Sequence, residues 1–247
     1  MKPTRPPKSL MRPIGRAIGD FDMIRSGDRI LLGVSGGKDS LSLLHIMLHL
    51  RNYSPVKFEL GVITVDPQVE GFDPSPLRPY LASLSVPYFY EQQPLMERAM
   101  HHMQKDSYCS WCARMKRGIM YAVARREHYN VLALAQHLDD LAESFLMSAF
   151  HAGQLRTMKA HYLIDAGDLR VIRPLVYVRE RQTRAYAQAV GLPVIGDNCP
   201  ACFRMPTQRM HMKQLLSSEE VSNELLFKRI LSTLKPLMTC DKTSLNK

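Results

Sequence analysis

A short glycine-containing loop lies between an apolar run and a helical pattern near the start of the chain. The run Arg-Ile-Leu-Leu-Gly-Val after Asp28 is almost wholly apolar, as in a strand that is buried on both faces of a parallel sheet. The hexapeptide Ser35-Gly36-Gly37-Lys38-Asp39-Ser40 follows directly, and apolar residues then recur at helical spacing from Leu41. Strand, glycine loop and helix in this order predict a nucleotide-binding βα unit.

The chemistry of this loop suits a bound phosphate. Gly36 and Gly37 let the backbone approach an anion closely, while successive N–H groups and the helix N-terminus supply partial positive charge. Lys38 adds a full positive charge, and the hydroxyls of Ser35 and Ser40 are further hydrogen-bond donors. A tight turn with a serine cap is the plainer alternative. The position between strand and helix favours phosphate binding.

Strand and helix patterns alternate along the next hundred residues. Strands are predicted at residues 58–65, 88–91 and 131–135, and helices at residues 76–84, 112–128 and 139–151. This alternation predicts an α/β fold with a doubly wound, mainly parallel sheet. The last third is helical in pattern, at residues 179–190, 208–216 and 218–234. We therefore expect a mobile basic arm at residues 1–15, an α/β domain at 16–195 with the first cysteine pair, and a helical extension at 196–247 with the second.

The composition favours a polyanionic partner. Lys and Arg total 33 against 23 Asp and Glu, and the formal net charge of +10 suits binding to RNA through counterion release. The chain has no apolar run of about 18 residues, and its five cysteines do not resemble a secreted disulfide framework. We expect a cytoplasmic protein without a membrane segment. The sequence leaves the oligomeric state open, a homodimer included.

A second motif follows the strand predicted at residues 131–135. It reads Ala135-Gln136-His137-Leu138-Asp139-Asp140, and it opens a predicted helix. Paired carboxylates at the edge of a sheet suit Mg²⁺ on a nucleotide, and an imidazole beside them suits proton transfer or donation to an oxyanion. The plainer interpretation is that Asp139 caps the helix and His137 is a partly buried spacer.

Four of the five cysteines form two Cys-x2-Cys pairs, Cys109 with Cys112 and Cys199 with Cys202. Such pairs in a reducing compartment indicate metal or cluster ligation. A structural zinc site uses all four thiolates, whereas an iron–sulfur cluster can use three and leave one iron open. Spacing by itself favours zinc, which is the commoner use of such pairs. Cys240 stands alone, and we assign it no role.

The hexapeptide matches the signature of the PP-loop ATP pyrophosphatases, and the chain resembles that superfamily. The order of its other motifs, at residues 109–121, 136–140, 172–175 and 199–202, resembles the TtcA family of tRNA-cytidine 2-sulfurtransferases. The resemblance covers nearly the whole chain. It implies an adenine nucleotide alpha-hydrolase-like PP-loop fold and cleavage of ATP between its α and β phosphates.

The resemblance also implies roles for individual residues. The implied catalytic residues are Lys38, Asp39, His137 and Asp140. The implied nucleotide-binding residues are Ser35, Gly36, Gly37, Lys38, Asp39, Ser40, Asp66 and Asp139. A [4Fe-4S] cluster is implied on Cys109, Cys112 and Cys202, with Cys199 as the alternative or fourth ligand.

The implied reaction is ATP-dependent thiolation of tRNA. ATP adenylates the C2 oxygen of a cytidine, at position 32 of the anticodon loop, and sulfur held at an iron without a protein ligand replaces that oxygen. The implied partners are tRNA and a sulfur donor, either a cysteine desulfurase or sulfide. Two alternatives stay open: another PP-loop tRNA-modifying ligase such as a lysidine synthetase, and a non-catalytic RNA-binding protein stapled by zinc.

Two departures from the family pattern concern the surroundings of the site. Residues 203–206, Phe-Arg-Met-Pro, stand where the family usually has Gly-Ser-Gln. The first glycine of the family's Gly-His-x-x-Asp-Asp element is also replaced, by Ala135 or Gln136. A related enzyme that acts on another base or another tRNA position is therefore compatible with the sequence.

Overall fold

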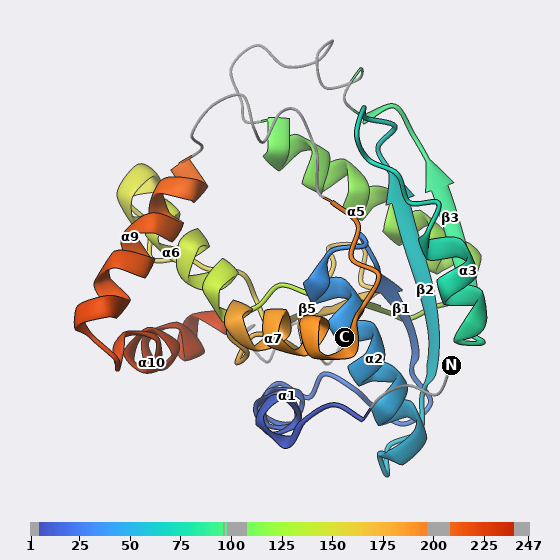
Figure 1. The fold of residues 1–247 in the computed structure, drawn as a ribbon, viewed down its shortest axis with the longest axis horizontal. Helices are drawn as coiled ribbons and strands as arrows, with labels where there is room; N and C mark the ends of the chain where they lie inside the picture. The colour runs from blue at the N-terminus through green and yellow to red at the C-terminus, as the bar shows by residue number, and fades with distance from the viewer. Residues whose placement is uncertain (1–4, 96, 98–107, 197–207, 240–247) are drawn as a thin grey trace.

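The computed structural model describes residues 5–95, 97, 108–196 and 208–239, and one six-stranded sheet organises them (Figure 1). Its strand order is β3-β2-β1-β4-β6-β5. Every neighbouring pair is parallel except β5 with β6. The strands are β1 (Arg29–Gly33), β2 (Glu59–Asp66), β3 (Tyr88–Gln92), β4 (Val131–Ala133), β5 (His161–Leu163) and β6 (Arg170–Ile172).

The order of the strands reverses between β1 and β4. From β1 the chain proceeds outward to β2 and β3, and it then returns to place β4 on the other side of β1. The carboxyl ends of β1 and β4 are neighbours, because Leu32 pairs with Ala133 in the parallel register. A doubly wound sheet binds its ligands at such a reversal. The glycine loop follows β1 and the second motif follows β4, so both predicted nucleotide motifs lie there.

Helices cover both faces of the sheet. In β1 the side chains alternate, since Ile30 and Leu32 belong to a larger apolar cluster and Leu31 to a smaller one on the opposite face. The larger cluster takes in residues of α1 (Lys8–Asp20), α2 (Lys38–Tyr53), α3 (Leu77–Ser83), α6 (Leu138–Ala152), α7 (Glu180–Val190), α9 (Gln208–Ser222) and α10 (Leu226–Met238). The smaller cluster includes residues of α5 (Tyr108–Arg126). The expected α/β class is confirmed.

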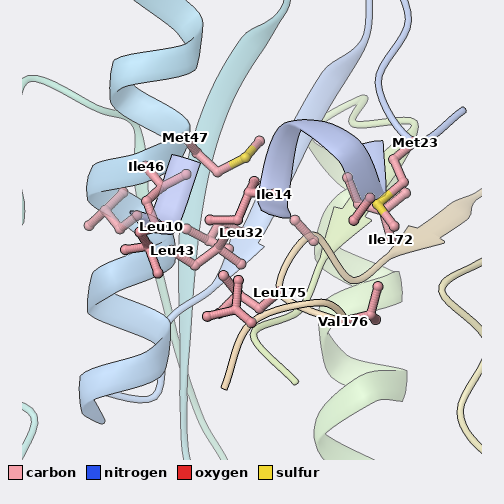
Figure 2. Packing of buried hydrophobic residues seen from close by; sticks show 14 of the residues in the cluster. Leu10, Ile14, Met23, Leu32, Leu43, Ile46, Met47, Ile172, Leu175 and Val176 are labelled. Carbon is pink, nitrogen blue, oxygen red and sulfur yellow. The ribbon is translucent and has the colours of Figure 1, made fainter. Parts of the chain in front are cut away.

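The arm expected at residues 1–15 is wrong for residues 8–15, which begin α1. Leu10, Ile14 and Ala17 follow one another at spacings of four and three, and all three are buried. Figure 2 shows Leu10 and Ile14 among Leu43 and Ile46 of α2 in the larger cluster. The prolines and basic residues of this segment obscured a short amphipathic face, whose burial stabilises the helix.

Two further boundaries differ from the sequence-based expectation. The helix predicted at residues 218–234 is interrupted, because α9 continues to Ser222 and α10 begins at Leu226. β5 and β6 were not predicted at all, since each has three residues and too little pattern to recognise. Within the described parts of the chain, every helix is too short or too polar to span a bilayer.

Candidate functional site

The glycine loop joins β1 to α2 at the carboxyl edge of the sheet. Gly37 is the N-cap of α2, and no side chain caps this helix terminus. The Ser40 hydroxyl donates to the Gly37 carbonyl at 2.9 Å, and the Ser35 and Ser40 hydroxyl oxygens lie 3.3 Å apart. An uncapped helix N-terminus with two hydroxyls beside it has the donors that a phosphate requires.

Gly36 has a second reason to be glycine. Its φ of +87° lies in the left-handed region, and a Cβ built there would lie 2.2 Å from Cγ1 of Ile195. The Ile195 N–H also donates to the Gly36 carbonyl at 3.1 Å. The segment after α7 therefore packs directly on the loop. The sequence indicated close approach by an anion at this position, whereas the structure shows close approach by Ile195.

The Lys38 ammonium lies between two carboxylates. Its Nζ is 2.9 Å from Oδ2 of Asp39 and 2.9 Å from Oε1 of Glu180, the first residue of α7. Burial by itself would lower the pKa of Lys38, but the hydrogen bonds to Glu180 and Asp39 outweigh it and raise that pKa. Lys38 therefore stays charged, and the two carboxylates hold its ammonium in place beside the glycine loop.

Glu180 is a site residue that the sequence did not reveal. It accepts from Lys38 and, at 2.7 Å, from Lys213 of α9. Burial by itself would raise its pKa, but the two lysines lower it far below the ordinary value for a glutamate. Its position in the first turn of α7 is an ordinary place for an acidic residue, so no local signal pointed to the phosphate loop.

The second motif caps α6 and faces the loop. Nδ1 of His137 accepts from the Asp140 N–H at 3.3 Å, and the His137 N–H donates to Oδ2 of Asp140 at 2.9 Å. The other ring nitrogen, Nε2, lies 3.7 Å from Oδ2 of Asp39. The imidazole of one motif thus lies beside the carboxylate of the other. His137, predicted as catalytic and alternatively as a spacer, is the N-cap of α6.

Asp139 caps a different helix from the expected one. Its Oδ2 accepts from the Glu180 N–H at 2.8 Å, at the start of α7, and Arg179 donates to both of its oxygens at 3.1 and 3.2 Å. Arg179 also pairs with Glu220 of α9 at 2.6 Å. Asp139 therefore connects the second motif to α7, and through Arg179 to α9.

Asp140 is held from α9 as well. Arg209 donates to Oδ1 of Asp140 at 2.5 Å and to Oε2 of Glu143 at 2.8 Å. Burial raises the pKa of Glu143 in spite of the nearby guanidinium. The structure thus adds Arg179, Arg209 and Lys213 to the residues around the two motifs.

Asp66 lies at the same sheet edge, at the end of β2. Its Oδ2 accepts from the Tyr90 hydroxyl at 2.5 Å, and its Oδ1 accepts from the Gln68 N–H at 2.8 Å. The Arg78 guanidinium lies over the Tyr90 ring, 4.3 Å from its centre. Asp66 is a predicted nucleotide-binding residue, and its carboxylate also holds the loop that follows β2 through the hydrogen bond from Gln68.

The first cysteine pair lies in the first turns of α5. The chain reaches α5 from the carboxyl end of β3, and it leaves α5 for the amino end of β4 (Figure 1). The start of α5 is therefore near the carboxyl edge, where both nucleotide motifs lie. Cys112 is partly exposed and packs against the smaller cluster. Cys199 and Cys202 lie outside the described residues, as does the Cys109 side chain.

Comparisons with known proteins identify the family of the chain. A family model described as a PP-loop domain matches residues 8–216. A tRNA-cytidine(32) 2-sulfurtransferase of Geobacter sulfurreducens is 40% identical over 92% of this chain and 89% of its own length. A protein of the same name from Pelobacter propionicus is 41% identical over 86% of this chain and 80% of its own length.

A solved structure shares the fold. The U34-tRNA thiolase NcsA from Methanococcus maripaludis, solved with its [4Fe-4S] cluster, has a TM-score of 0.75 and 19% identity, over 95% of this chain and 79% of the thiolase. The sequence relatives carry the finer assignment, since their identity is about twice as high. The chain therefore belongs to the PP-loop domain family and, within it, to the family of tRNA-cytidine(32) 2-sulfurtransferases.

Proposed function

We propose that this protein is an ATP-dependent tRNA sulfurtransferase that replaces the C2 oxygen of cytidine 32 with sulfur. The observation that carries the proposal is the meeting of both nucleotide motifs at the strand reversal, with the start of α5 at the same edge. The names of the relatives supply the substrate, and the net charge of +10 suits tRNA. The sulfur donor is proposed to be sulfide or a cysteine desulfurase.

The first half of the reaction uses the phosphate loop. The C2 oxygen of the cytidine attacks the α phosphorus of ATP, and the bond from that phosphorus to the pyrophosphate breaks. Lys38 neutralises the departing pyrophosphate, while the N-terminus of α2 donates to its oxygens. For this, Lys38 exchanges Glu180 or Asp39 for phosphate oxygens. Asp139 is the proposed carboxylate for Mg²⁺, in exchange for its present partner Arg179.

The second half requires a sulfur nucleophile near the activated base. A [4Fe-4S] cluster, when bound, supplies a position for that sulfur. Cys109 and Cys112 are three residues apart at the start of α5, the spacing of a Cys-x2-Cys pair. They are the proposed ligands of this cluster, with Cys202 as the proposed third thiolate. Sulfur bonds to C2, and AMP leaves with the former C2 oxygen.

The proposal is tested with anaerobically purified protein and tRNA that lacks the thiolated base. We expect bound iron and sulfide, tRNA-dependent pyrophosphate release, and 2-thiocytidine at position 32 by mass spectrometry. Lys38→Ala should abolish pyrophosphate release and keep the iron, because the ammonium acts on phosphate. Cys112→Ser should lose iron and thiolation, because a thiolate ligand is missing.

Other outcomes would point to the alternatives. Full activity in Cys112→Ser would favour a ligase that needs no cluster, and zinc in place of iron without AMP formation would favour a binding protein. Pyrophosphate release by Lys38→Ala at the wild-type rate would refute the role of this lysine. Thiolation at a base other than cytidine 32 would keep the chemistry and overturn the substrate.

A further inference from the structure

Helix α9 reaches both nucleotide motifs with two cations. Arg209 contacts Asp140 of the second motif, and Lys213 contacts Glu180, which also pairs with Lys38 of the glycine loop. α9 lies beside α6, whose first turn carries Asp140 (Figure 1). A helix from the last fifth of the chain therefore touches the side chains that surround the reaction.

The contacts of Arg209 divide between a buried and a reactive carboxylate. Its Nε donates to Glu143, whose side chain is 5% exposed, and its terminal NH2 donates to Asp140. The planar guanidinium has donors in a rigid fork, so it can hold two carboxylates in a set orientation. The Arg209 side chain is itself 49% exposed, whereas Asp140 is 19% exposed. The contact with Asp140 is the one through which Arg209 reaches the second motif.

The orientation of Asp140 is passed to His137. Arg209 contacts one oxygen of the Asp140 carboxylate, and the other accepts from the His137 N–H. The Asp140 N–H in turn donates to Nδ1 of His137, so the neutral ring carries its proton on Nε2. That nitrogen faces Asp39 at 3.7 Å. Arg209 is thus linked through Asp140 to the His137 ring, which faces Asp39 of the glycine loop.

We propose that Arg209 is a positioning residue for the adenylation step: it holds Asp140 so that His137 stays turned towards the phosphate loop. The inference rests on the proposed function for its kinetic consequence. Its geometric part stands on the described contacts: Arg209 pairs with Oδ1 of Asp140, and Oδ2 of the same carboxylate accepts from the His137 N–H and lies 3.3 Å from Nδ1 of the ring. The adenylation geometry is set in part by α9 and not by the two motifs alone.

The test compares variants that separate the two contacts of Arg209. We expect Arg209→Ala to lower kcat for tRNA-dependent pyrophosphate release about 10- to 100-fold, because small displacements of catalytic groups cost rates of this order. KM for ATP should stay near the wild-type value. Arg209→Lys should recover part of kcat, since one cation can still reach Asp140. Glu143→Gln keeps the Asp140 contact, so its kcat should stay near the wild-type value.

Arg229→Ala is the matched control, since this exposed arginine of α10 donates to Asn223 at 3.4 Å and contacts neither nucleotide motif among the described residues. Melting temperatures and iron contents exclude loss of the fold. Equal losses of kcat in Glu143→Gln and Arg209→Ala would overturn the inference, because Arg209 would then act through Glu143. Unchanged kcat in Arg209→Ala would overturn it as well.

A spectroscopic measurement decides the geometric part without turnover. In the wild type, ¹⁵N NMR of the His137 ring should show the proton on Nε2. Arg209→Ala should mix the two tautomers, because the released Asp140 carboxylate, 3.3 Å from Nδ1, can then accept from a protonated Nδ1. An identical ring spectrum in the wild type and in Arg209→Ala would overturn the inference. If the wild type releases no pyrophosphate, the proposed function fails, and this spectrum still decides what Arg209 does.

Discussion

At the scale of single residues, two separate constraints require glycine at position 36, one from its backbone conformation and one from the packing of Ile195. Its positive φ suits the turn into α2, and its missing Cβ leaves room for Ile195. Gly37, one residue later, has no such neighbour, because a Cβ there would meet nothing closer than 3.5 Å. The two glycines of the motif therefore carry different constraints.

A substitution separates these constraints. Gly27 has nearly the same φ as Gly36, +85° against +87°, and open space around it. We expect Gly27→Ala to cost about 1–2 kcal/mol of unfolding free energy from backbone strain. Gly36→Ala should cost about 1–3 kcal/mol more, because Ile195 must move, and it should weaken ATP binding. Denaturant titration measures both, and equal losses would show that Ile195 gives way freely.

At the scale of elements, α1 is part of the folded core. Its apolar face lies in the larger cluster, and polar contacts fix both ends. Gln182 of α7 donates to the Ser9 carbonyl at 3.1 Å, and Lys235 of α10 pairs with Asp20 at 2.7 Å. α1 thus joins two helices from the second half of the chain.

The burial of α1 makes a prediction that a mobile arm would not. Ile14 is completely buried, so Ile14→Ala should lower the unfolding free energy by about 2–5 kcal/mol. Arg12→Ala, on the exposed side of the same helix, should change it by no more than about 0.5 kcal/mol. Equal effects of the two substitutions in denaturant titrations would show that this segment behaves as a mobile arm.

At the scale of the whole molecule, Glu180 joins three helices. It lies on α7, and it pairs with Lys38 of α2 and Lys213 of α9. Its lowered pKa means that folding favours the charged carboxylate. This stabilisation is fully present above the unfolded-state pKa of about 4.3, and it is lost as the pH falls through the folded-state value.

The pH dependence of stability should therefore change in Glu180→Gln. At pH 7 we expect the variant to melt at a lower temperature than the wild type, because both lysines lose a charged partner. As the pH falls below about 4, the difference should shrink, since the unfolded wild-type chain then binds a proton at Glu180 that the folded protein takes up only at much lower pH. Thermal unfolding at a series of pH values measures this. A difference that stays constant down to pH 3 would show that the ion pairs of Glu180 do not matter.

The sequence by itself determined the parts of the site that are local. The glycine loop and the second motif each depend on neighbours within a few residues, so a buried strand, a turn and a helix start were enough to recognise them. Alternation of strands and helices predicted the sheet class for a similar reason. The resemblance added the nucleotide and the family, and the comparisons confirmed the family.

Only the tertiary structure decided which side chains complete the site. Glu180, Arg209 and Lys213 are ordinary charged residues of helices, and nothing in their neighbourhoods marks them. They meet Lys38 and Asp140 because the reversal of strand order brings β1 and β4 together and packing places α7 and α9 over their loops. Ion pairs between distant segments depend on that packing and leave no periodic signal in the chain. The burial of Leu10 and Ile14 has the same origin, since their partners on α2 are supplied by the fold.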